Sequence, residues 1–357
     1  AGDRARRVAP AGVAGGTWRV IPAAPIEGRI DSVSVWTGEE QFVWGGYGRA
    51  TNTGFLDGAL FNPSTGQWRR VAASPLRTGL AREAVWTGTE AIIWGGEDSD
   101  HPARPDHGAA YNPTTDSWRS LSPAPDWSLA GHSLVWTGEE MIAWGGVDMG
   151  RAALLYDPDE DEWRVGSRAP IGSHHSHVAV WTGNEMIVWG GKALVPGPAH
   201  DGAAYDPETD SWRLLPDGGI APRANASAVW TGNEMIVLGG TVGRSSFVSD
   251  GVAFDPSSNL WRQIPDAPSG GYGESVVWTG SEMIASGGRT GPVRMPPISS
   301  GLFAAYAPTR NEWATLPLPP RPTSRPSVVW TGRALIVWGG WDTSIGRLRA
   351  DGALFLP

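Results

Sequence analysis

The sequence predicts an all-β protein, a seven-bladed β-propeller with four antiparallel strands in each blade. A Trp-Thr-Gly triplet recurs seven times at intervals of 45 to 52 residues. Each repeat contains four short apolar segments separated by turn residues, and none has room for a helix. The 357 residues include 49 glycines and 30 prolines, which is typical of a chain with many turns. Four strands in a unit of this length, repeated seven times, favour a closed ring of blades.

The tryptophans define the strands in order. The first strand of each blade ends at the Trp of the triplet, and these are Trp36, Trp86, Trp136, Trp181, Trp230, Trp278 and Trp330. The second strand ends before a Gly-Gly pair, about ten residues later. The third ends before an Asp-Pro-like turn, and the fourth contains another Trp, in the series Trp18, Trp68, Trp118, Trp163, Trp212, Trp261 and Trp313. Side chains in these series are expected to pack between blades.

The two ends of the chain complete one blade together. The seventh copy ends after its third strand, at 351–355, whereas the chain begins with an unmatched fourth strand around Trp18. The N-terminal strand is therefore expected to complete the last blade and close the ring. We expect one domain over residues 16–357, preceded by a flexible leader at residues 1–15.

Composition excludes several classes of protein. Lys and Arg number 28 against 37 Asp and Glu, a formal net charge of −9 that disfavours nucleic acid and anionic lipid as partners. There is no cysteine, so disulfides, thiolate nucleophiles, Cys-type zinc sites and iron–sulfur clusters are excluded. No stretch is long and apolar enough to span a membrane. The lack of cysteine favours a secreted or periplasmic location, and a cytoplasmic one is the alternative.

The repeats resemble the Kelch family. The resemblance rests on the paired glycines, on the aromatic residue before the Asp-Pro-like turn, and on the Trp that follows this turn. The aromatic residues are Phe61, Tyr111, Tyr156, Tyr205, Phe254 and Tyr306. It implies a Kelch-type propeller whose first strands line a central channel. The family includes adaptor domains, sugar mutarotases, plant specifier proteins and galactose-oxidase-like enzymes, so it does not determine the function. Copper-radical oxidases need a Tyr–Cys crosslink, which a chain without cysteine cannot form.

One face of the propeller is expected to be the working face. The connections between strands one and two and between strands three and four are short and uniform, which indicates a structural role. The connections from strand two to three and from strand four to the next blade share the other face and differ between blades, from five residues at 147–151 to thirteen at 289–301. Variable loops on a uniform scaffold commonly carry function. We call this the variable-loop face.

All seven histidines lie between residues 101 and 200. Neutral imidazoles bind divalent transition metals, so this sector could hold such an ion, with His107, His132, His175 and His177 as the candidate ligands. The alternative is that His132 and His177 are ordinary residues before the first strand and that the others are loop residues. Nothing in the sequence suggests haem, an iron–sulfur cluster or a nucleotide, and known hydrolase, Walker and zincin motifs are absent.

The position four residues before each first-strand Trp is expected to point toward the channel entrance. It holds Ser32, Arg82, His132, His177, Ala226, Glu274 and Pro326. Arg82, His132, His177 and Glu274 are the candidate catalytic and ligand-binding residues, with Arg82 able to clamp a carboxylate. Arg29, Arg223 and Arg325 could extend a cationic rim, and Arg223 is also a candidate ligand-binding residue. The alternative is a water-filled channel with a merely tolerated lining.

Trp127 and Trp341 are the tryptophans that the repeat does not explain. Exposed indoles at a polar rim commonly stack on sugars, peptides or cations, so both are candidate ligand-binding residues. In the alternative, each covers a neighbouring loop. Residues that recur in most repeats are expected to serve the fold and not the site. The Asp before strand three (Asp57, Asp201, Asp250 and Asp351) is expected to bond the backbone. The Arg that follows six of the seven fourth-strand tryptophans is expected to be solvated.

The leading functional hypothesis is a ligand-binding or protein-interaction propeller. Its partner would be a small polar or anionic molecule, a glycan or a protein, bound at the variable-loop face and channel mouth. The alternative is an enzyme at the same mouth, with a His-rich and metal-dependent or acid–base site of the isomerase, cyclase or lyase type. A purely structural repeat domain is a third possibility. The sequence leaves the choice open.

Overall fold

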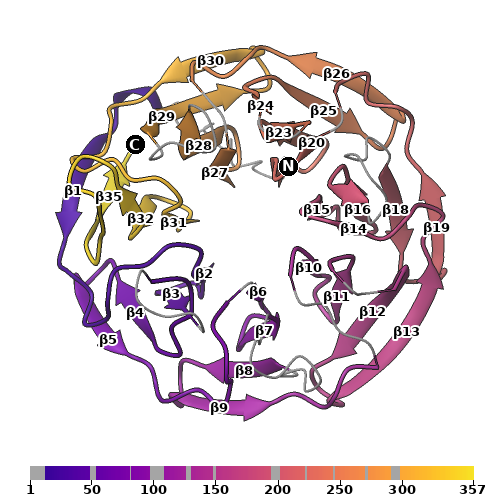
Figure 1. Cartoon of the computed structure of the whole chain (residues 1–357), viewed down its shortest axis with the longest axis horizontal. Coiled ribbons are helices and arrows are strands. Elements are labelled where there is room, and N and C mark those ends of the chain that lie inside the picture. Colours follow the sequence, from indigo (N-terminus) through magenta and orange to yellow (C-terminus); the bar gives the residue numbers. More distant parts are fainter. Residues whose placement is uncertain are drawn as a thin grey trace, which may run out of the picture.

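The structure is a computed structural model that describes residues 13–48, 54–80, 82–96, 108–125, 130–147, 150–193, 202–221, 223–243, 246–269, 272–290 and 298–357. These residues form seven four-stranded antiparallel sheets arranged in a ring (Figure 1). The only helix among them is a short 3-10 turn at Val13–Gly15. The all-β propeller expected from the repeats is therefore confirmed. None of the described helical residues forms a helix that could cross a membrane.

The first three sheets follow one another along the chain, and each uses four consecutive strands. They are β2 (Val33–Trp36), β3 (Gln41–Trp44), β4 (Gly58–Asn62) and β5 (Gln67–Arg70); β6 (Arg82–Trp86), β7 (Ala91–Gly95), β8 (Gly108–Asn112) and β9 (Ser117–Ser120); and β10 (Ser133–Trp136), β11 (Met141–Trp144), β12 (Ala152–Asp157) and β13 (Glu162–Arg168).

The next three sheets repeat this order. They are β15 (Val178–Trp181), β16 (Met186–Trp189), β18 (Gly202–Asp206) and β19 (Ser211–Leu214); β21 (Ser227–Trp230), β22 (Met235–Leu238), β25 (Gly251–Asp255) and β26 (Leu260–Ile264); and β27 (Tyr272–Trp278), β28 (Met283–Thr290), β29 (Ile298–Ala307) and β30 (Glu312–Thr315).

The seventh sheet joins the two ends of the chain. Its strands are β31 (Ser327–Trp330), β32 (Leu335–Trp338), β35 (Gly352–Leu356) and, at its outer edge, β1 (Thr17–Ile21). β1 pairs with β35 in antiparallel register, from Thr17 opposite Leu356 to Ile21 opposite Gly352. Figure 1 shows the first strands β2, β6, β10, β15, β27 and β31 innermost in the ring, and β1, β5, β9, β13, β19, β26 and β30 outermost.

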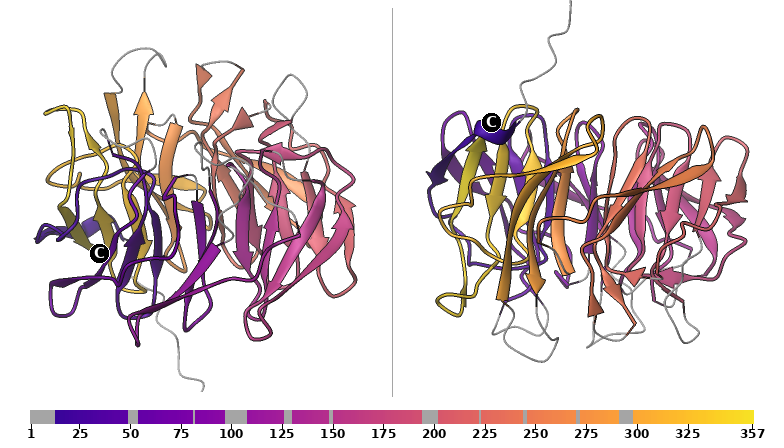
Figure 2. Two further views of the ribbon diagram at one scale, coloured as in Figure 1. Left: turned by 60° about the horizontal axis from the view of Figure 1, so that its bottom comes forward. Right: turned by 90° about the horizontal axis from the view of Figure 1, so that it is seen from above.

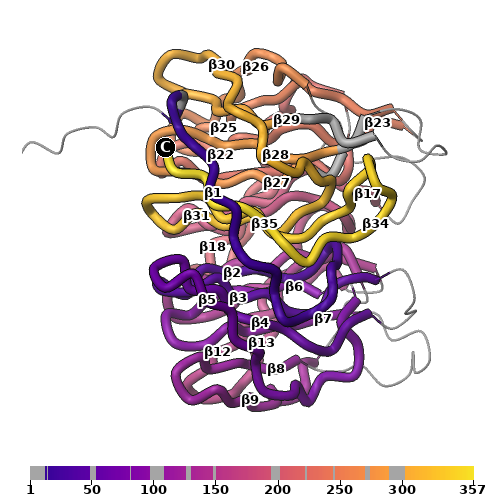
Figure 3. Tube along the Cα trace, turned by 90° about the vertical axis from the view of Figure 1, so that its left-hand side faces the viewer, coloured from indigo at the N-terminus to yellow at the C-terminus, as the bar shows by residue number. Residues whose placement is uncertain are grey.

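Short strands extend the sheets on the variable-loop face. They are β14 (His174–His175) with β17 (Lys192–Ala193); β20 (Arg223–Ala224) with β23 (Thr241–Val242) and β24 (Ser246–Phe247); and β33 (Trp341–Asp342) with β34 (Arg347–Leu348). In Figure 3, β17, β23 and β34 lie on the same side of the ring. Seen from the side, the sheets stand upright around the central axis (Figure 2).

The turn after each first strand explains the Thr-Gly pair. The Thr37 side-chain oxygen accepts a hydrogen bond from the Glu40 amide at 3.0 Å, and Gly38 has a φ of 99°, which only glycine adopts without strain.

The Gly-Gly pair after each second strand is required for a different reason, which is the close approach of another segment. A Cβ on Gly191 would lie 2.8 Å from the His175 carbonyl oxygen, so a larger residue would push away the incoming 4–1 connection.

The core lies between neighbouring sheets. The side chains of the second strands, such as Ile142 and Trp144 in β11, are fully buried. Each fourth-strand tryptophan donates its indole N–H to a carbonyl in the preceding sheet, as Trp163 does to Ser122 at 2.9 Å. The other six bonds join Trp18 to Pro317, Trp68 to Pro22, Trp118 to Ala72, Trp212 to Ser167, Trp261 to Pro216 and Trp313 to Pro265. These tryptophans are packing residues between sheets, as expected.

The segment expected to be a leader reaches the core at its end. Val13 is buried and packs with Ile284 and Phe355 between the sixth and seventh sheets, while its amide donates to the Glu282 carboxylate at 3.0 Å. In five other sheets the equivalent glutamate pairs with the fourth-strand arginine, but Ala314 stands at that position in the sixth sheet. Residues 1–12 lie outside the described residues.

Candidate functional site

A cavity of about 820 Å³ lies at the mouth of the central channel on the variable-loop face. Its walls come from the starts of the first strands and the connections that lead into them. An adjoining cavity of about 340 Å³ shares Asp31, Asn225, Ser275 and Arg325 with it. Hydroxyl, amide, carboxyl and guanidinium groups line both, so the channel mouth is polar.

A ring of left-handed residues surrounds this mouth. The position five residues before the first-strand Trp has positive φ at Asp31, Gly131, Ser176, Asn225 and Arg325, with values from 53° to 69°. We call these five residues the mouth ring. Left-handed backbone is costly for most side chains, and Asp and Asn tolerate it better than Ser or Arg. Such conformations persist where the surrounding structure enforces them, which is common at binding sites.

Backbone and side-chain bonds hold the mouth ring together. The Ser176 amide donates to the Gly131 carbonyl and the Asn225 amide to the Ser176 carbonyl, both at 2.8 Å. Arg325 forms an ion pair with Asp31, which joins the seventh sheet to the first. Serine hydroxyls add links just below, between Ser32 and Ser327 at 2.7 Å and from Ser275 to the Pro326 carbonyl at 3.0 Å. The site is therefore largely preformed.

The structure places the predicted residues Arg82 and Glu274 beside these cavities but buries them. Both line the cavity walls and both are only 5% exposed. The Arg82 Nε donates to the Thr78 carbonyl at 2.7 Å, and its side chain packs against Gly96. At Arg82 and Glu274, the side chain four residues before the tryptophan is therefore packed into the cavity wall, against the Gly-Gly segment of its own sheet, and is not open to the channel as expected.

His132 and His177 lie between sheets. His132 is 4% exposed and packs edge-on against the Trp94 indole, and His177 packs edge-on against Trp144 while its Nε2 lies 2.7 Å from the Ser133 hydroxyl. Burial lowers the pKa of His132 to about 4 and that of His177 to about 3. Both imidazoles are therefore neutral at pH 7, which suits metal binding but not proton transfer near neutrality.

The structure does not group the three described candidate metal ligands, His132, His175 and His177, into a metal site. His175 is half-buried, with its Nδ1 3.2 Å from the Ser176 hydroxyl, and His107 lies outside the described residues. Within the described part of the chain, no three His, Asp or Glu side chains are grouped to hold a metal ion. A metal involving His107 stays a prediction.

Arg223 has a structural position that differs from the exposed rim expected of it. Its side chain has no exposed surface, and its guanidinium pairs bidentately with Asp250 at 2.8 Å and reaches the Gly239 carbonyl at 3.2 Å. Arg29 repeats this arrangement with Asp57 and the Gly45 carbonyl. The Asp before strand three is thus the ion partner of a buried arginine in these two sheets, and not only a backbone-bonding turn residue.

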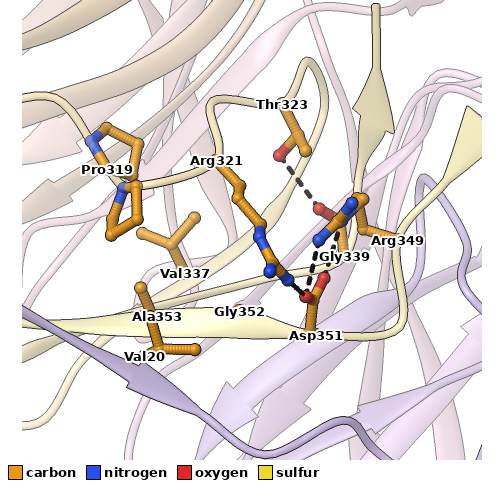
Figure 4. Close-up of a pocket in the computed structure, with 11 residues that line it drawn as sticks. Val20, Pro319, Arg321, Thr323, Val337, Gly339, Arg349, Asp351, Gly352 and Ala353 are labelled. Atoms are coloured by element: carbon orange, nitrogen blue, oxygen red, sulfur yellow. Dashed lines mark hydrogen bonds and ion pairs between the residues drawn. The ribbon is translucent and has the colours of Figure 1, made fainter. Parts of the chain in front are cut away.

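The aspartate at the same position in the seventh sheet also has arginine partners (Figure 4). Asp351 accepts hydrogen bonds from Arg349 and Arg321 beside a cavity of about 20 Å³. That volume suits a single water molecule. This cluster therefore helps to close the ring, and the cavity beside it is too small to hold a larger ligand.

Of the two unexplained tryptophans, one is described. Trp341 is half-buried, and its backbone exchanges two hydrogen bonds with Ser324 at the start of the β33–β34 hairpin. It is not among the residues that line the two channel cavities. Trp127 lies outside the described residues, so its role stays a prediction.

Glu83, Asp31 and Asn225 line the channel cavity but were not among the predicted site residues, and Arg325 was expected only to extend a cationic rim. They lie three or five residues before the first-strand Trp, whereas the residue four before it was predicted to point toward the channel entrance. Side chains alternate between the two sides of a strand, so a prediction that is wrong by one residue selects side chains on the side away from the channel. The recurrence of Asp, Gly and Asn at position five is typical of left-handed backbone and could have revealed the mouth ring.

Comparison with known proteins agrees with this architecture. A family model described as the KLHDC2/KLHL20/DRC7 Kelch-repeats domain matches residues 81–288 and 131–340. The chain is also similar to a solved structure titled "Structure of YjhT", with 16% identity, a TM-score of 0.65, and coverage of 83% of this chain and 99% of that one. At that identity the similarity concerns the fold alone. No curated protein matches the sequence. Since the matches to the family model span residues 81–340, more than half of the chain, the protein belongs to the Kelch-repeat family.

Proposed function

We propose that this Kelch propeller binds a small, polar, carbohydrate-like molecule in the channel mouth on its variable-loop face. The observation that carries the proposal is the cavity of about 820 Å³, which lies within the size range of small-molecule sites. Its lining combines the hydroxyls of Ser34 and Ser275 with the side chains of Asn225 and Asp31. Hydroxyl and amide groups both donate to and accept from the hydroxyls of a polyol, and a carboxylate accepts from them.

The rigidity of the mouth supports binding. The linked backbone of the mouth ring and the Arg325–Asp31 pair fix the polar groups before a ligand arrives. A preformed site loses less conformational entropy when it binds. The variable loops that begin at this face would then determine which ligands reach the mouth.

A blocked-channel variant tests the proposal. Binding of a panel of neutral and charged polyols is measured by isothermal titration calorimetry on the wild type and on Ser275→Tyr, which places a phenol in the cavity. Ser281→Tyr, on the opposite face, is the matched control. We expect wild type and Ser281→Tyr to bind alike and Ser275→Tyr to lose at least tenfold in affinity. Binding that survives in a folded Ser275→Tyr protein would place the site elsewhere.

A further inference from the structure

Glu83 brings a carboxyl group without a partner into the channel cavity. It is the second residue of β6 and lines the cavity wall. Its side chain is exposed to the open space of the channel, and it forms no hydrogen bond or ion pair with any side chain or backbone group that the structure describes. Unpaired carboxyl groups within a protein are uncommon because they lose hydration without compensation.

The other charged groups along the two cavities are either paired with each other or buried in the wall. Asp31 and Arg325 pair with each other. Arg82 is buried and bonded to the Thr78 carbonyl, and Glu274 is 5% exposed. Glu83 is therefore the charge that the described part of the cavity offers to a ligand, and its sign is negative.

We propose that the channel site takes a polar ligand that carries a protonated amine, and that the Glu83 carboxylate pairs with this cation. The inference rests on the function proposed above and specifies its ligand class. It differs from the anionic ligand that Arg82 suggested in the sequence, because Arg82 is buried and bonded within the wall. A charge-assisted hydrogen bond in a partly enclosed site is stronger than one at an open surface.

The position of Glu83 also predicts how binding depends on pH. Protein surrounds the carboxyl group inside the channel, and this loss of hydration raises its pKa to about 7. The strands packed against β6, which are β2, β7 and β10, carry no charged residue, so the charged groups facing Glu83 are those of the cavity wall: Arg82, Asp31, Arg325 and Glu274. A cation binds the carboxylate and not the acid. Its affinity should therefore rise as the pH rises through 7.

The test uses three polyhydroxy compounds that share a six-carbon chain and differ in charge: N-methylglucamine, sorbitol and gluconate. Their binding is measured by isothermal titration calorimetry at pH 6 and pH 8, on the wild type, Glu83→Gln, and Glu39→Gln as an exposed control. For wild type and Glu39→Gln we expect the affinity to decrease from N-methylglucamine to sorbitol to gluconate. The affinity for N-methylglucamine should increase about tenfold from pH 6 to pH 8, as a pKa of about 7 requires. In Glu83→Gln both the preference and the pH dependence should disappear, while sorbitol binding is retained.

The outcomes separate the two proposals. Equal binding of sorbitol and N-methylglucamine, or a preference for gluconate, overturns the cation inference and leaves the polyol site in place. Failure of all three probes to bind the wild type overturns both. The wild type gives a second measurement that needs no variant: titrations at pH 7 in buffers of different ionisation enthalpy should show about half a proton released for each N-methylglucamine bound. No proton release would contradict the role of Glu83.

Discussion

Arg119 donates a hydrogen bond from its Nη1 to the Tyr156 hydroxyl at 2.9 Å and so joins the second sheet to the third. The same guanidinium pairs with Glu90 in its own sheet at 2.8 Å, and the Tyr156 hydroxyl donates to Asp161. This relay recurs with Glu40, Arg69, Tyr111 and Asp116, and with Glu234, Arg262, Tyr306 and Asn311. The arginine expected to be merely solvated thus connects neighbouring sheets.

Removing the Tyr156 hydroxyl should weaken this connection. Tyr156→Phe deletes both bonds of the hydroxyl, and we expect the free energy of unfolding to fall by about 1 to 2 kcal/mol. Phe254 stands at the equivalent position of the fifth sheet, so a phenyl ring fits there. Urea denaturation measures the change, with the exposed Tyr47→Phe as the control. Equal stability of both variants and the wild type would show that the relay contributes little.

Arg223 should matter for stability and not for binding. Arg223→Ala removes the partner of Asp250 and the donor to the Gly239 carbonyl. Because the Asp250 side chain is 40% exposed and regains water, the cost should be below that of a fully buried pair, at about 2 to 3 kcal/mol. Arg325→Ala breaks a more exposed pair, which should cost about 1 kcal/mol or less. Thermal and urea denaturation compare the two variants. An Arg223→Ala protein as stable as the wild type would return Arg223 to the list of candidate ligand contacts.

His132 should make the protein less stable in acid. Its pKa is about 4 in the folded protein because of burial, but ordinary, near 6.5, in the unfolded chain. The unfolded state therefore binds more protons between these values, so stability is complete above pH 6.5 and declines as the pH falls toward 4. The full loss is about 3 kcal/mol. His132→Phe should show a flatter dependence of the free energy of unfolding on pH. An unchanged slope would contradict the prediction.

Glu83 should have the opposite effect on stability. Its pKa is about 7 in the folded protein and near 4.5 in the unfolded chain, so the folded state binds more protons between these values. Stability contributed by the protonated form therefore declines as the pH rises from 4.5 to 7. Because the side chain is exposed to the channel, the expected difference between Glu83→Gln and the wild type at pH 8 is on the order of 1 kcal/mol in favour of Gln. The difference should shrink toward pH 5. Denaturation of both proteins at pH 5 and pH 8 measures it, and a less stable Glu83→Gln protein at pH 8 would contradict it.

The repeat pattern in the sequence predicts the fold but only part of the candidate site. Trp-Thr-Gly and Gly-Gly fix local turns, so the strands could be predicted from residues close together in the sequence. The partners of Arg29 and Arg223, Asp57 and Asp250, lie 28 and 27 residues further along the chain, which is more than half a repeat. In the sequence they are visible only as a pairing that recurs in the two copies with an arginine. The raised pKa of Glu83 comes from its enclosure in a channel whose walls are far apart in the sequence, and no local pattern encodes that enclosure.

The pairing of β1 with β35 has a consequence for how the protein is made. The innermost, middle and outermost strands of six sheets emerge in order from the ribosome, and each of these sheets can form while synthesis continues. The seventh must wait, because its outer strand is made first and its neighbour last. Closing so long a loop has an entropic cost that only a nearly complete ring offsets. Sealing of this joint should therefore be the slow step of folding, and its opening the first step of unfolding.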